Sequence, residues 1–408
     1  MQPVGTIALQ DWMTAAPTRA VIAALEAQGA EVRFVGGCVR DALAGRPIKD
    51  IDIATPDAPE RVMALLEAAG LKAIPTGLQH GTVTAVAAHH PFEITTLRED
   101  VETFGRHATV AFTDDWKADA ARRDFTMNAL SLAPDGRLYD PFEGRADLAA
   151  GRVRFVGEAT ARIREDYLRI LRFFRFQSHY GKLPPDPAIL AAIGAEAAGI
   201  EGLSGERLRA EMLKLLAAPD PYPALSAMRD CGALAFVLAQ ADLAGLRSLL
   251  RLERRADALL RLASLLPPGE AAARQAAVRL RLSNAERDLL LLLLAPGFDL
   301  ALDSGRQTLR LAAYRLGLES LSKLLLLKAA REEASPETLA AALACLEDWR
   351  APRFPLQGRD LLEMGYAPGP ALGRALAALE DWWIGQDFAP SREACLAEAR
   401  RRLEAAAQ

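Results

Sequence analysis

The spacing of hydrophobic residues predicts several strands near the start of the chain. An apolar run at residues 32–35 is typical of a short buried strand. Residues 48–54 alternate apolar and polar side chains, which predicts a second strand. Residues 81–88 and 92–97 alternate in the same way, and the short polar segment between them predicts a hairpin. We therefore expect a small sheet in the first third of the chain.

Helical periodicity surrounds these strands. Residues 17–29 have the pattern of an amphipathic helix, and Asp57 with Glu60 predicts a capping box for a helix that ends near residue 69. Residues 98–115 are polar and weakly patterned, so we expect a mobile loop there. Ordered structure is expected again from residue 119.

The remaining two thirds of the sequence have a purely helical pattern. Strand signals end after residues 153–156, and proline and glycine pairs then divide the chain into helices of ordinary length. The predicted fold class is α+β, with a small N-terminal head on a mixed sheet followed by an all-α region. The domains that we expect are a head at 1–148, a neck at 149–217, a helical body at 218–290 and a helical tail at 291–408.

Composition excludes some classes of protein. The 408 residues are 51% hydrophobic and the net charge is −4, so an RNA would need a local basic surface. The four cysteines lie far apart without a CxxC pair, which argues against a zinc site or a disulfide framework. The longest leucine run, residues 289–294, is too short to span a membrane, and the first residues lack the apolar core of a secretory signal. We expect a cytoplasmic protein with no membrane partner.

The strongest candidates for functional residues lie in residues 35–55. Gly36 and Gly37 follow the first strand and open a helix, whose unpaired N–H groups suit a phosphate. Period-two alternation puts Asp50 and Asp52 on one face of the next strand. Adjacent carboxylates repel each other unless a cation lies between them, and oxygen ligands suit Mg²⁺. Such a site supports phosphoryl or nucleotidyl transfer, although two acids on a polar strand edge would give the same pattern.

The sequence GGCVRDALAGRPIKDIDIAT, residues 36–55, resembles the first motif of the class II tRNA nucleotidyltransferase and poly(A) polymerase family, within the polymerase-β-like nucleotidyltransferase superfamily. The resemblance implies that Asp50 and Asp52 bind two Mg²⁺ ions. It also implies a triphosphate site formed by Gly36, Gly37 and Arg40. Glu93, in a stretch EITTLR that resembles a neighbouring strand of the family, is either a third metal ligand or an exposed strand residue.

Two further stretches resemble parts of the same family. Residues 98–115 resemble a flexible loop that helps the switch from adding C to adding A, and that enzymes adding only CC lack; Arg106 is a candidate within it, although Phe104 stands where many relatives have an acid. A solvated connection would have the same composition. The stretch ADAARRDFTMNAL, residues 118–130, resembles a second motif, in which two cations and an acceptor suit a nucleotide's phosphate and ribose. The implied contacts come from Arg122, Arg123 and Asp124.

The helix predicted at residues 165–178, EDYLRILRFFRFQS, carries Asp166 and Arg169 on one face, which Arg172 continues. A helical salt bridge is the commonest reason for this spacing. Cytosine and adenine, however, both present an exocyclic amine beside a ring-nitrogen acceptor, so a carboxylate with a guanidinium would accept C and A and reject U and G. The stretch resembles the family's EDxxR motif, which implies that Asp166, Arg169 and Arg172 select the nucleobase.

The last motif that resembles the family is LSGERLRAEMLKLL, residues 203–216. We expect Ser204 to cap this helix, and Glu206, Arg207 and Glu211 to brace the neck rather than contact substrate. Residues 220–408 match no motif. The last of the five histidines is His179, which excludes a His-Asp phosphohydrolase module from the C-terminal half.

The resemblance implies template-independent addition of C, C and A to the 3′ end of tRNA from CTP and ATP, with release of pyrophosphate. The helical body and tail would bind tRNA through local basic residues. The alternatives are a poly(A) polymerase, commonly with a basic C-terminal extension that the ending EARRRLEAAAQ does not resemble, and a partial A-adding or CC-adding enzyme. An alternative of a different class is a non-catalytic RNA-binding protein, against which the intact pair of aspartates counts. The sequence does not indicate an oligomeric state.

Overall fold

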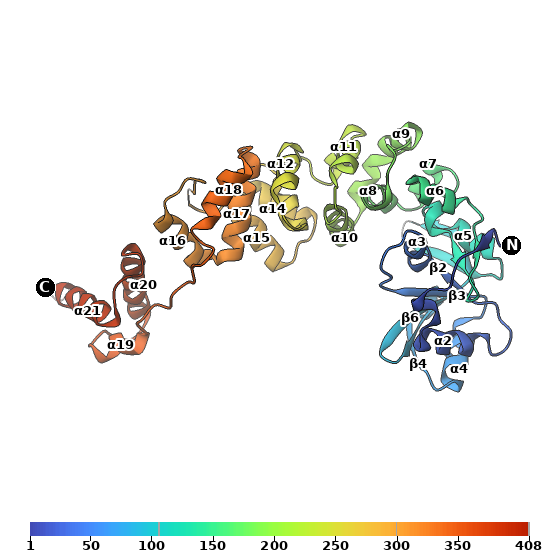
Figure 1. Cartoon of the computed structure of the whole chain (residues 1–408), viewed down its shortest axis with the longest axis horizontal. Helices are drawn as coiled ribbons and strands as arrows, with labels where there is room; N and C mark the ends of the chain where they lie inside the picture. The colour runs from blue at the N-terminus through green and yellow to red at the C-terminus, as the bar shows by residue number, and fades with distance from the viewer. Residues whose placement is uncertain (105–106, 299, 407–408) are drawn as a thin grey trace. The chain divides into compact units, whose positions relative to one another are not determined.

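A computed structural model describes residues 1–104, 107–298 and 300–406 of the chain. Its contacts form two compact units, one of residues 1–241 with 256–258 and 278–282, the other of the remaining residues. The first unit contains a mixed sheet followed by helices, and the second is helical (Figure 1). The predicted α+β fold class is confirmed, whereas the division into four domains stays a prediction.

The head is built on an eight-stranded sheet with the order β1-β10-β9-β2-β3-β6-β5-β4. Strands β3 and β6 run parallel, and the other neighbours in the sheet are antiparallel. The strands are β1 (Gly5–Thr6), β2 (Arg33–Val35), β3 (Ile51–Thr55), β4 (Lys72–Gly77), β5 (Thr82–Ala87), β6 (His90–Thr96), β9 (Ser131–Leu132) and β10 (Arg137–Tyr139).

The predicted strands correspond to the sheet with two corrections. The predicted hairpin is β5–β6, connected by Ala88 and His89 with φ of 47° and 67°, as two-residue hairpin loops require. The strand predicted at 48–54 begins only at Ile51, so Asp50 precedes it. The strand predicted at 153–156 is wrong, because this segment makes only an isolated bridge between Phe155 and Phe125.

Most of the segment predicted as a mobile loop, residues 98–115, is strand; its mobility stays a prediction. The backbone forms β7 (Arg98–Phe104) and β8 (His107–Phe112), an antiparallel pair separate from the main sheet. The alternating sequence HATVAF of β8 is a strand signal that the polar composition of the segment conceals. Arg106, the candidate within the expected loop, lies outside the residues that the structure describes.

Helices α2 (Ala16–Glu26) and α4 (Pro59–Ala68) cover one face of the sheet (Figure 1). The capping box predicted for α4 is wrong, because Ala58 is the N-cap and Pro59, which has no N–H to satisfy, occupies the first turn. Each large apolar side chain buried here contributes about 1.5–3 kcal/mol. The shared core includes Val21, Leu25, Phe34, Ile53, Val62, Leu66 and Ile94. Because Ile53 faces these helices, strand alternation turns Asp52 toward the opposite face.

A cluster of phenylalanines joins the head to helix α8 (Leu168–Tyr180). The ring centroids of Phe125 lie 5.0 Å from Phe155 and 4.9 Å from Phe176, and Phe155 stacks on Phe173 at 5.7 Å. Aromatic pairs at these distances contribute about 0.5–1.5 kcal/mol beyond the area that they bury. This cluster holds α8 in place beside the sheet.

Residues 1–241 contain further α-helices and several short 3-10 turns. They are α1 (Asp11–Thr14), α3 (Gly37–Leu43), α5 (Trp116–Ala121), α6 (Gly144–Ala150), α7 (Ala159–Glu165), α9 (Pro187–Glu196), α10 (Gly205–Leu216) and α11 (Tyr222–Asp230), with 3-10 turns at Leu78–His80, Thr126–Asn128, Ala197–Gly202 and Ala233–Phe236.

The C-terminal part of the chain follows the predicted helical pattern. Its helices are α12 (Ala244–Leu252), α13 (Ala258–Ser264), α14 (Glu270–Arg279), α15 (Asn284–Leu294), α16 (Arg306–Leu316), α17 (Leu318–Arg331), α18 (Pro336–Ala344), α19 (Gly358–Glu363), α20 (Pro370–Gly385) and α21 (Arg392–Ala406). A capping box of Ser283 and Glu286 starts α15, whose leucines are partly or fully buried. In the described ranges, no helix has both the length and the apolar character needed to cross a membrane.

Candidate active site

The site begins at Gly36, where a side chain would be strained and crowded. Gly36 follows β2 with φ of +69°, a conformation that favours glycine. A Cβ at this position would lie 3.1 Å from Nη1 of Arg123 and 3.6 Å from Oδ2 of Asp52. The backbone of Gly36 therefore lies against both a cationic and an acidic side chain of the site.

Three carboxylates lie near one another on the sheet. The parallel pairing of β3 and β6 places Asp52 beside Glu93, and Asp50 directly precedes β3. Burial and the charges of Glu93 and Asp50 raise the pKa of Asp52 to about 6, although Arg123 and Arg40 act in the opposite direction. A bound cation would remove this unfavourable charge, so the donor set fits a hard divalent metal ion.

The acids do not form a preformed metal cage. Within the described part of the chain, no three His, Cys, Asp or Glu side chains converge closely enough to hold a metal by themselves. Such a site suits an ion that keeps water ligands and takes others from substrate phosphates, as Mg²⁺ does. Cys38 is buried next to these acids, and its thiol donates to the Val35 carbonyl at 3.3 Å. Burial raises the pKa of this thiol to about 12, so it does not act as a metal ligand.

Arg40 is held from several sides. Its Nη1 donates to Oδ1 of Asn128 at 2.7 Å, and its Nε and Nη2 donate to Asp41 at 3.1 and 3.0 Å. The guanidinium also lies 4.5 Å from the ring centre of Tyr180, whose hydroxyl donates to Asp41 at 2.6 Å. These contacts keep a cation at the cavity wall, where a phosphate can approach it.

Asp119 anchors the two arginines of the second motif. It accepts from Nε of Arg122 at 2.9 Å and from Nη2 of Arg123 at 3.3 Å. Burial alone would raise the pKa of Asp119, but the charges of Arg123 and Arg122 lower it below its usual value. Arg123 extends to the wall of the cavity, whereas Arg122 does not line it.

Asp124 is buried and fully engaged. Its Oδ1 accepts from the Phe125 amide at 2.9 Å and from Nδ2 of Asn128 at 2.8 Å, and its Oδ2 accepts from Nε and Nη2 of Arg172 at 2.7 and 2.5 Å. Burial alone would raise the pKa of Asp124, but Arg172 and these hydrogen bonds lower it. The geometry therefore favours a role in holding Arg172 and Asn128 over direct contact with a ribose.

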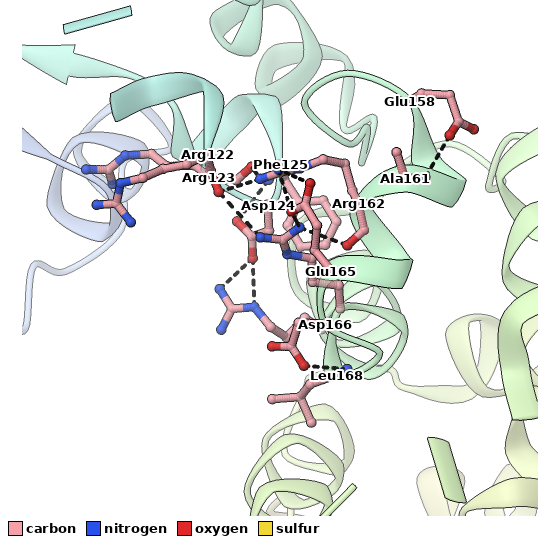
Figure 2. A network of polar contacts seen from close by, with 12 residues as sticks. Arg122, Arg123, Asp124, Phe125, Glu158, Ala161, Arg162, Glu165, Asp166 and Leu168 are labelled. Carbon is pink, nitrogen blue, oxygen red and sulfur yellow. Dashed lines mark hydrogen bonds and ion pairs between the residues drawn. The ribbon is translucent and has the colours of Figure 1, made fainter. Parts of the chain in front are cut away.

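The predicted continuous helix at residues 165–178 is wrong. Helix α7 ends at Glu165, Asp166 has an extended backbone with φ −157° and ψ 105°, and α8 begins at Leu168. Oδ1 of Asp166 accepts from the Leu168 amide at 3.1 Å, and its Oδ2 accepts from Nη2 of Arg207 at 2.6 Å. Asp166 thus lies at a helix junction, where it accepts from the Leu168 amide (Figure 2). Its ion pair is with Arg207 rather than with Arg169.

Arg169 has a different set of partners. Its Nη1 forms an ion pair with Glu165 and donates to the Arg162 carbonyl at 2.8 Å. Arg162 in turn bonds Glu165 and donates to the Arg123 carbonyl at 2.8 Å, so the network connects α7 to the second motif (Figure 2). The helical salt bridge between Asp166 and Arg169 does not form.

The glycines, Asp52 and the neck residues line one cavity of about 460 Å³. Of the predicted site residues, those in its wall are Gly36, Gly37, Arg40, Asp52, Arg123, Asp124, Asp166, Arg169 and Arg172. Asp50, Glu93 and Arg122 are not in the wall. Residues in the wall that the sequence did not single out are Asn128, Leu168, Arg175 and Phe176, together with Arg207, which was expected only to brace the neck.

Comparison with known proteins identifies the family. Residues 32–154 match the family described as "Poly A polymerase head domain", and residues 183–243 match "Probable RNA and SrmB- binding site of polymerase A". The mitochondrial CCA tRNA nucleotidyltransferase 1 of Danio rerio is 37% identical over 383 residues, which cover 90% of this chain and 86% of that protein. The chain belongs to the CCA tRNA nucleotidyltransferase family.

The chain is also similar to bacterial CCA-adding enzymes over nearly its whole length. The enzyme of Limosilactobacillus fermentum is 31% identical over 405 residues, or 95% of this chain and 97% of that protein. The crystal structure of the Bacillus stearothermophilus CCA-adding enzyme in complex with CTP has a TM-score of 0.76 and 31% identity, covering 95% of this chain and 97% of that one. The predicted family and enzyme class are confirmed. Nucleotidyltransferases of this kind generally use divalent metal ions.

Several residues of this CCA tRNA nucleotidyltransferase family member were hard to find from sequence. Glu211 is buried and accepts from Nε of Arg175 at 2.5 Å, a contact between α10 and α8 that agrees with its expected bracing role, which stays a prediction. Arg207 braces Asp166 but also faces the cavity. Ser204 is the N-cap of α10 without a side-chain capping bond. Asn128 had a signal, since it follows Arg123 and Asp124 within the second motif.

Proposed function

We propose that the chain adds C, C and A in turn to the 3′ end of tRNA, using CTP and ATP without a nucleic-acid template and releasing pyrophosphate. The observation that carries the proposal is the single cavity whose wall contains Asp52 beside the diglycine, and Asp166 with Arg169. One group of residues suits phosphate transfer and the other suits the recognition of a base. The Bacillus stearothermophilus CCA-adding enzyme, one of the relatives of known structure, was solved with CTP.

Asp50 and Asp52, with Glu93 as a third candidate, would hold Mg²⁺. A bound ion of this kind lowers the pKa of an attacking 3′-hydroxyl and stabilises a pyrophosphate leaving group. The raised pKa of Asp52 supports this assignment, because its carboxylate is destabilised by burial and by neighbouring acids until a cation is present. Glu93 is exposed and lies beside Asp52 in register, so it can reach a shared ion without lining the cavity.

Gly36, Gly37, Arg40 and Arg123 would bind the triphosphate. The two glycines leave space for phosphate oxygens close to the backbone, and the two guanidiniums offset their charge. Arg40 is already oriented by Asp41 and Asn128, so little conformational freedom is lost when a phosphate binds. Arg122 would act indirectly, because its carbonyl, rather than its side chain, faces the neck arginines.

Asp166 and Arg169 would select the base. Each oxygen of Asp166 accepts one hydrogen bond in this structure, which leaves acceptor capacity for the exocyclic amine of C or A. Arg169 uses Nη1 for Glu165, while its Nη2 makes only a 3.4 Å contact with the Arg122 carbonyl. That nitrogen can donate to the ring nitrogen of either base. U and G would leave the remaining acceptor capacity of Asp166 and Nη2 of Arg169 without a base partner, which costs about 10⁴–10⁵-fold in sites of this type.

Arg172 would extend the base-selecting wall, with Asp124 and Asn128 holding it in position. The helices beyond residue 218 would bind tRNA through local basic residues, since the net charge is −4. We also propose a cytoplasmic location, which the four unpaired cysteines support. The vertebrate relatives are named as mitochondrial, so fractionation of tagged cells is the direct test.

The decisive experiment uses three tRNAs, ending before CCA, after C and after CC, with each of the four nucleotides supplied separately. We expect C, C and A to be added in turn and then a stop, only in the presence of Mg²⁺. Open-ended addition of A to any RNA would instead indicate a poly(A) polymerase. Addition of C alone or of A alone would indicate a partial enzyme, and the absence of any incorporation would leave only an RNA-binding role.

A further inference from the structure

A second cavity in residues 1–241 has a basic wall. It has a volume of about 340 Å³, and its wall contains Arg46 after α3, Arg145 in α6 and Lys182 after α8. The apolar side chains of Leu43 and Leu148 form much of the rest. No predicted site residue takes part in this cavity, and no acidic side chain is in its wall.

The three cations are not neutralised by the protein. In the part of the chain that the structure describes, none of them forms an ion pair with a carboxylate, whereas most arginines of this acidic chain do. Arg46 has a structural role, because it donates to the His179 carbonyl in the last turn of α8. Arg145 and Lys182 are exposed side chains without a comparable contact. Their position around one cavity is the feature that suits an anionic ligand.

A tyrosine separates this cavity from the catalytic one. The ring centre of Tyr180 lies 4.2 Å from the guanidinium of Arg46 and 4.5 Å from that of Arg40. Its hydroxyl donates to Asp41, which in turn holds Arg40. The second cavity therefore lies one aromatic ring away from the arginine assigned to the triphosphate.

We propose that the second cavity binds a backbone phosphate of the RNA substrate, with Arg145 and Lys182 as its main contacts and Arg46 in support. This inference rests on the proposed function. A phosphodiester carries one negative charge and is flanked by ribose, which suits a few cations set beside apolar side chains. The volume of about 340 Å³ accommodates more than a bare phosphate.

An RNA backbone fits the cavity better than a nucleoside triphosphate does. The catalytic cavity already offers a nucleotide both cations and base-recognition groups, including Arg40, Arg123, Asp166 and Arg169. Among the described residues, the second cavity has cations and apolar surface but no carboxylate that could accept from the amine of a base. It thus suits a contact that ignores sequence, which an enzyme acting on many tRNAs requires.

The test compares two double variants of the full chain. Arg145→Gln with Lys182→Gln removes two charges from the cavity. Arg19→Gln with Arg61→Gln removes two charges from exposed positions on α2 and α4, so the net charge of the two proteins is equal. For each we would measure KM for tRNA, KM for CTP, kcat, and direct tRNA binding at several salt concentrations.

We expect the cavity variant to raise KM for tRNA by about 10-fold and to reduce the slope of log K against log salt by about 1, with KM for CTP unchanged. Identical results for the two variants would overturn the proposal. A rise in KM for CTP instead would assign the cavity to a free nucleotide phosphate and would also overturn it. Direct binding separates this outcome from a failure of the proposed function, because tRNA binding can be measured even if no nucleotide is incorporated.

Discussion

The two ends of the catalytic cavity handle negative charge in opposite ways. At the sheet, Asp52 lies beside Glu93, and its pKa is raised to about 6 by burial and by acidic neighbours. At the end that faces the neck, Asp124 is buried more deeply than Asp52, but Arg172 and local hydrogen bonds hold its pKa below the usual value. The first end is short of positive charge and the second is balanced. Buried carboxylates with too little positive charge around them are candidates for binding a cation. A buried carboxylate that is paired with an arginine instead holds that arginine in position for recognition.

This difference has opposite consequences for stability. The carboxylate of Asp52 costs folding free energy near neutral pH, because burial favours its protonated form. The carboxylate of Asp124 contributes stability, because its charged form is hydrogen-bonded and paired. Variants that neutralise each aspartate should therefore separate activity from stability.

The largest effect is expected for Asp52→Asn. The change removes a metal ligand, so incorporation of both CTP and ATP should fall by at least about 10³-fold. It also removes an unfavourable buried charge, so the midpoint of thermal unfolding without metal should stay equal or rise. Primer extension and calorimetry on the same preparation measure the two quantities. A clear loss of stability would show that the charged carboxylate of Asp52 stabilises the fold, as that of Asp124 does. The proposed difference between the two aspartates would then be wrong.

The next effect concerns Asp124→Asn. Breaking its pair leaves the Arg172 charge with only a longer ion pair, to Glu211 at 3.9 Å, so the free energy of unfolding in urea should fall by about 3 kcal/mol. Asp135→Asn is the matched control, because Asp135 also pairs with an arginine but at an exposed site, and its loss should cost about 0.2–1 kcal/mol. Equal losses in the two variants would contradict the balanced network.

The pH dependence of the same variants has a defined sign. The folded pKa of Asp124 is lower than the unfolded value, about 3.9, so its contribution is fully present above that value and is lost as the pH falls toward the folded pKa. The difference in unfolding free energy between the natural chain and Asp124→Asn should therefore be constant near pH 7 and shrink below about pH 4.

The sequence predicted the sheet end of the cavity better than the neck end. Gly36, Gly37, Arg40 and Asp52 lie within one short segment, where local geometry already brings them together. Glu93 depends on the parallel pairing of β3 with β6, which periodicity cannot reveal. The antiparallel strand pair β7–β8 was not predicted, because the segment is so polar that its alternating pattern was overlooked.

At the neck, a helix pattern concealed a break. Apolar spacing continues through residues 165–178, but the helix breaks at Asp166, whose carboxylate accepts from the Leu168 amide and pairs with Arg207 of α10. Spacing can suggest that Asp166 and Arg169 act together, but it cannot show that each has another ion-pair partner. Arg207 reaches the cavity because α10 packs against α8, which is distant in sequence, so only the structure could place it.

The smallest of these effects concerns the fidelity of Arg169→Ala. The pairing of Arg169 with Glu165 keeps its guanidinium at the cavity wall, where it can meet the ring nitrogen of C or A. Without it, discrimination against UTP and GTP should fall by about 10–100-fold, since one buried hydrogen bond to a charged group contributes about 1.5–3 kcal/mol. Arg164→Ala is the control, because Arg164 is exposed and pairs with Glu196 on the outer side of the neck. Competition assays with mixed nucleotides give the ratio of kcat/KM directly. Retained discrimination in Arg169→Ala would assign base choice to other residues, and an equal loss in both variants would indicate a general disturbance of α7 and α8.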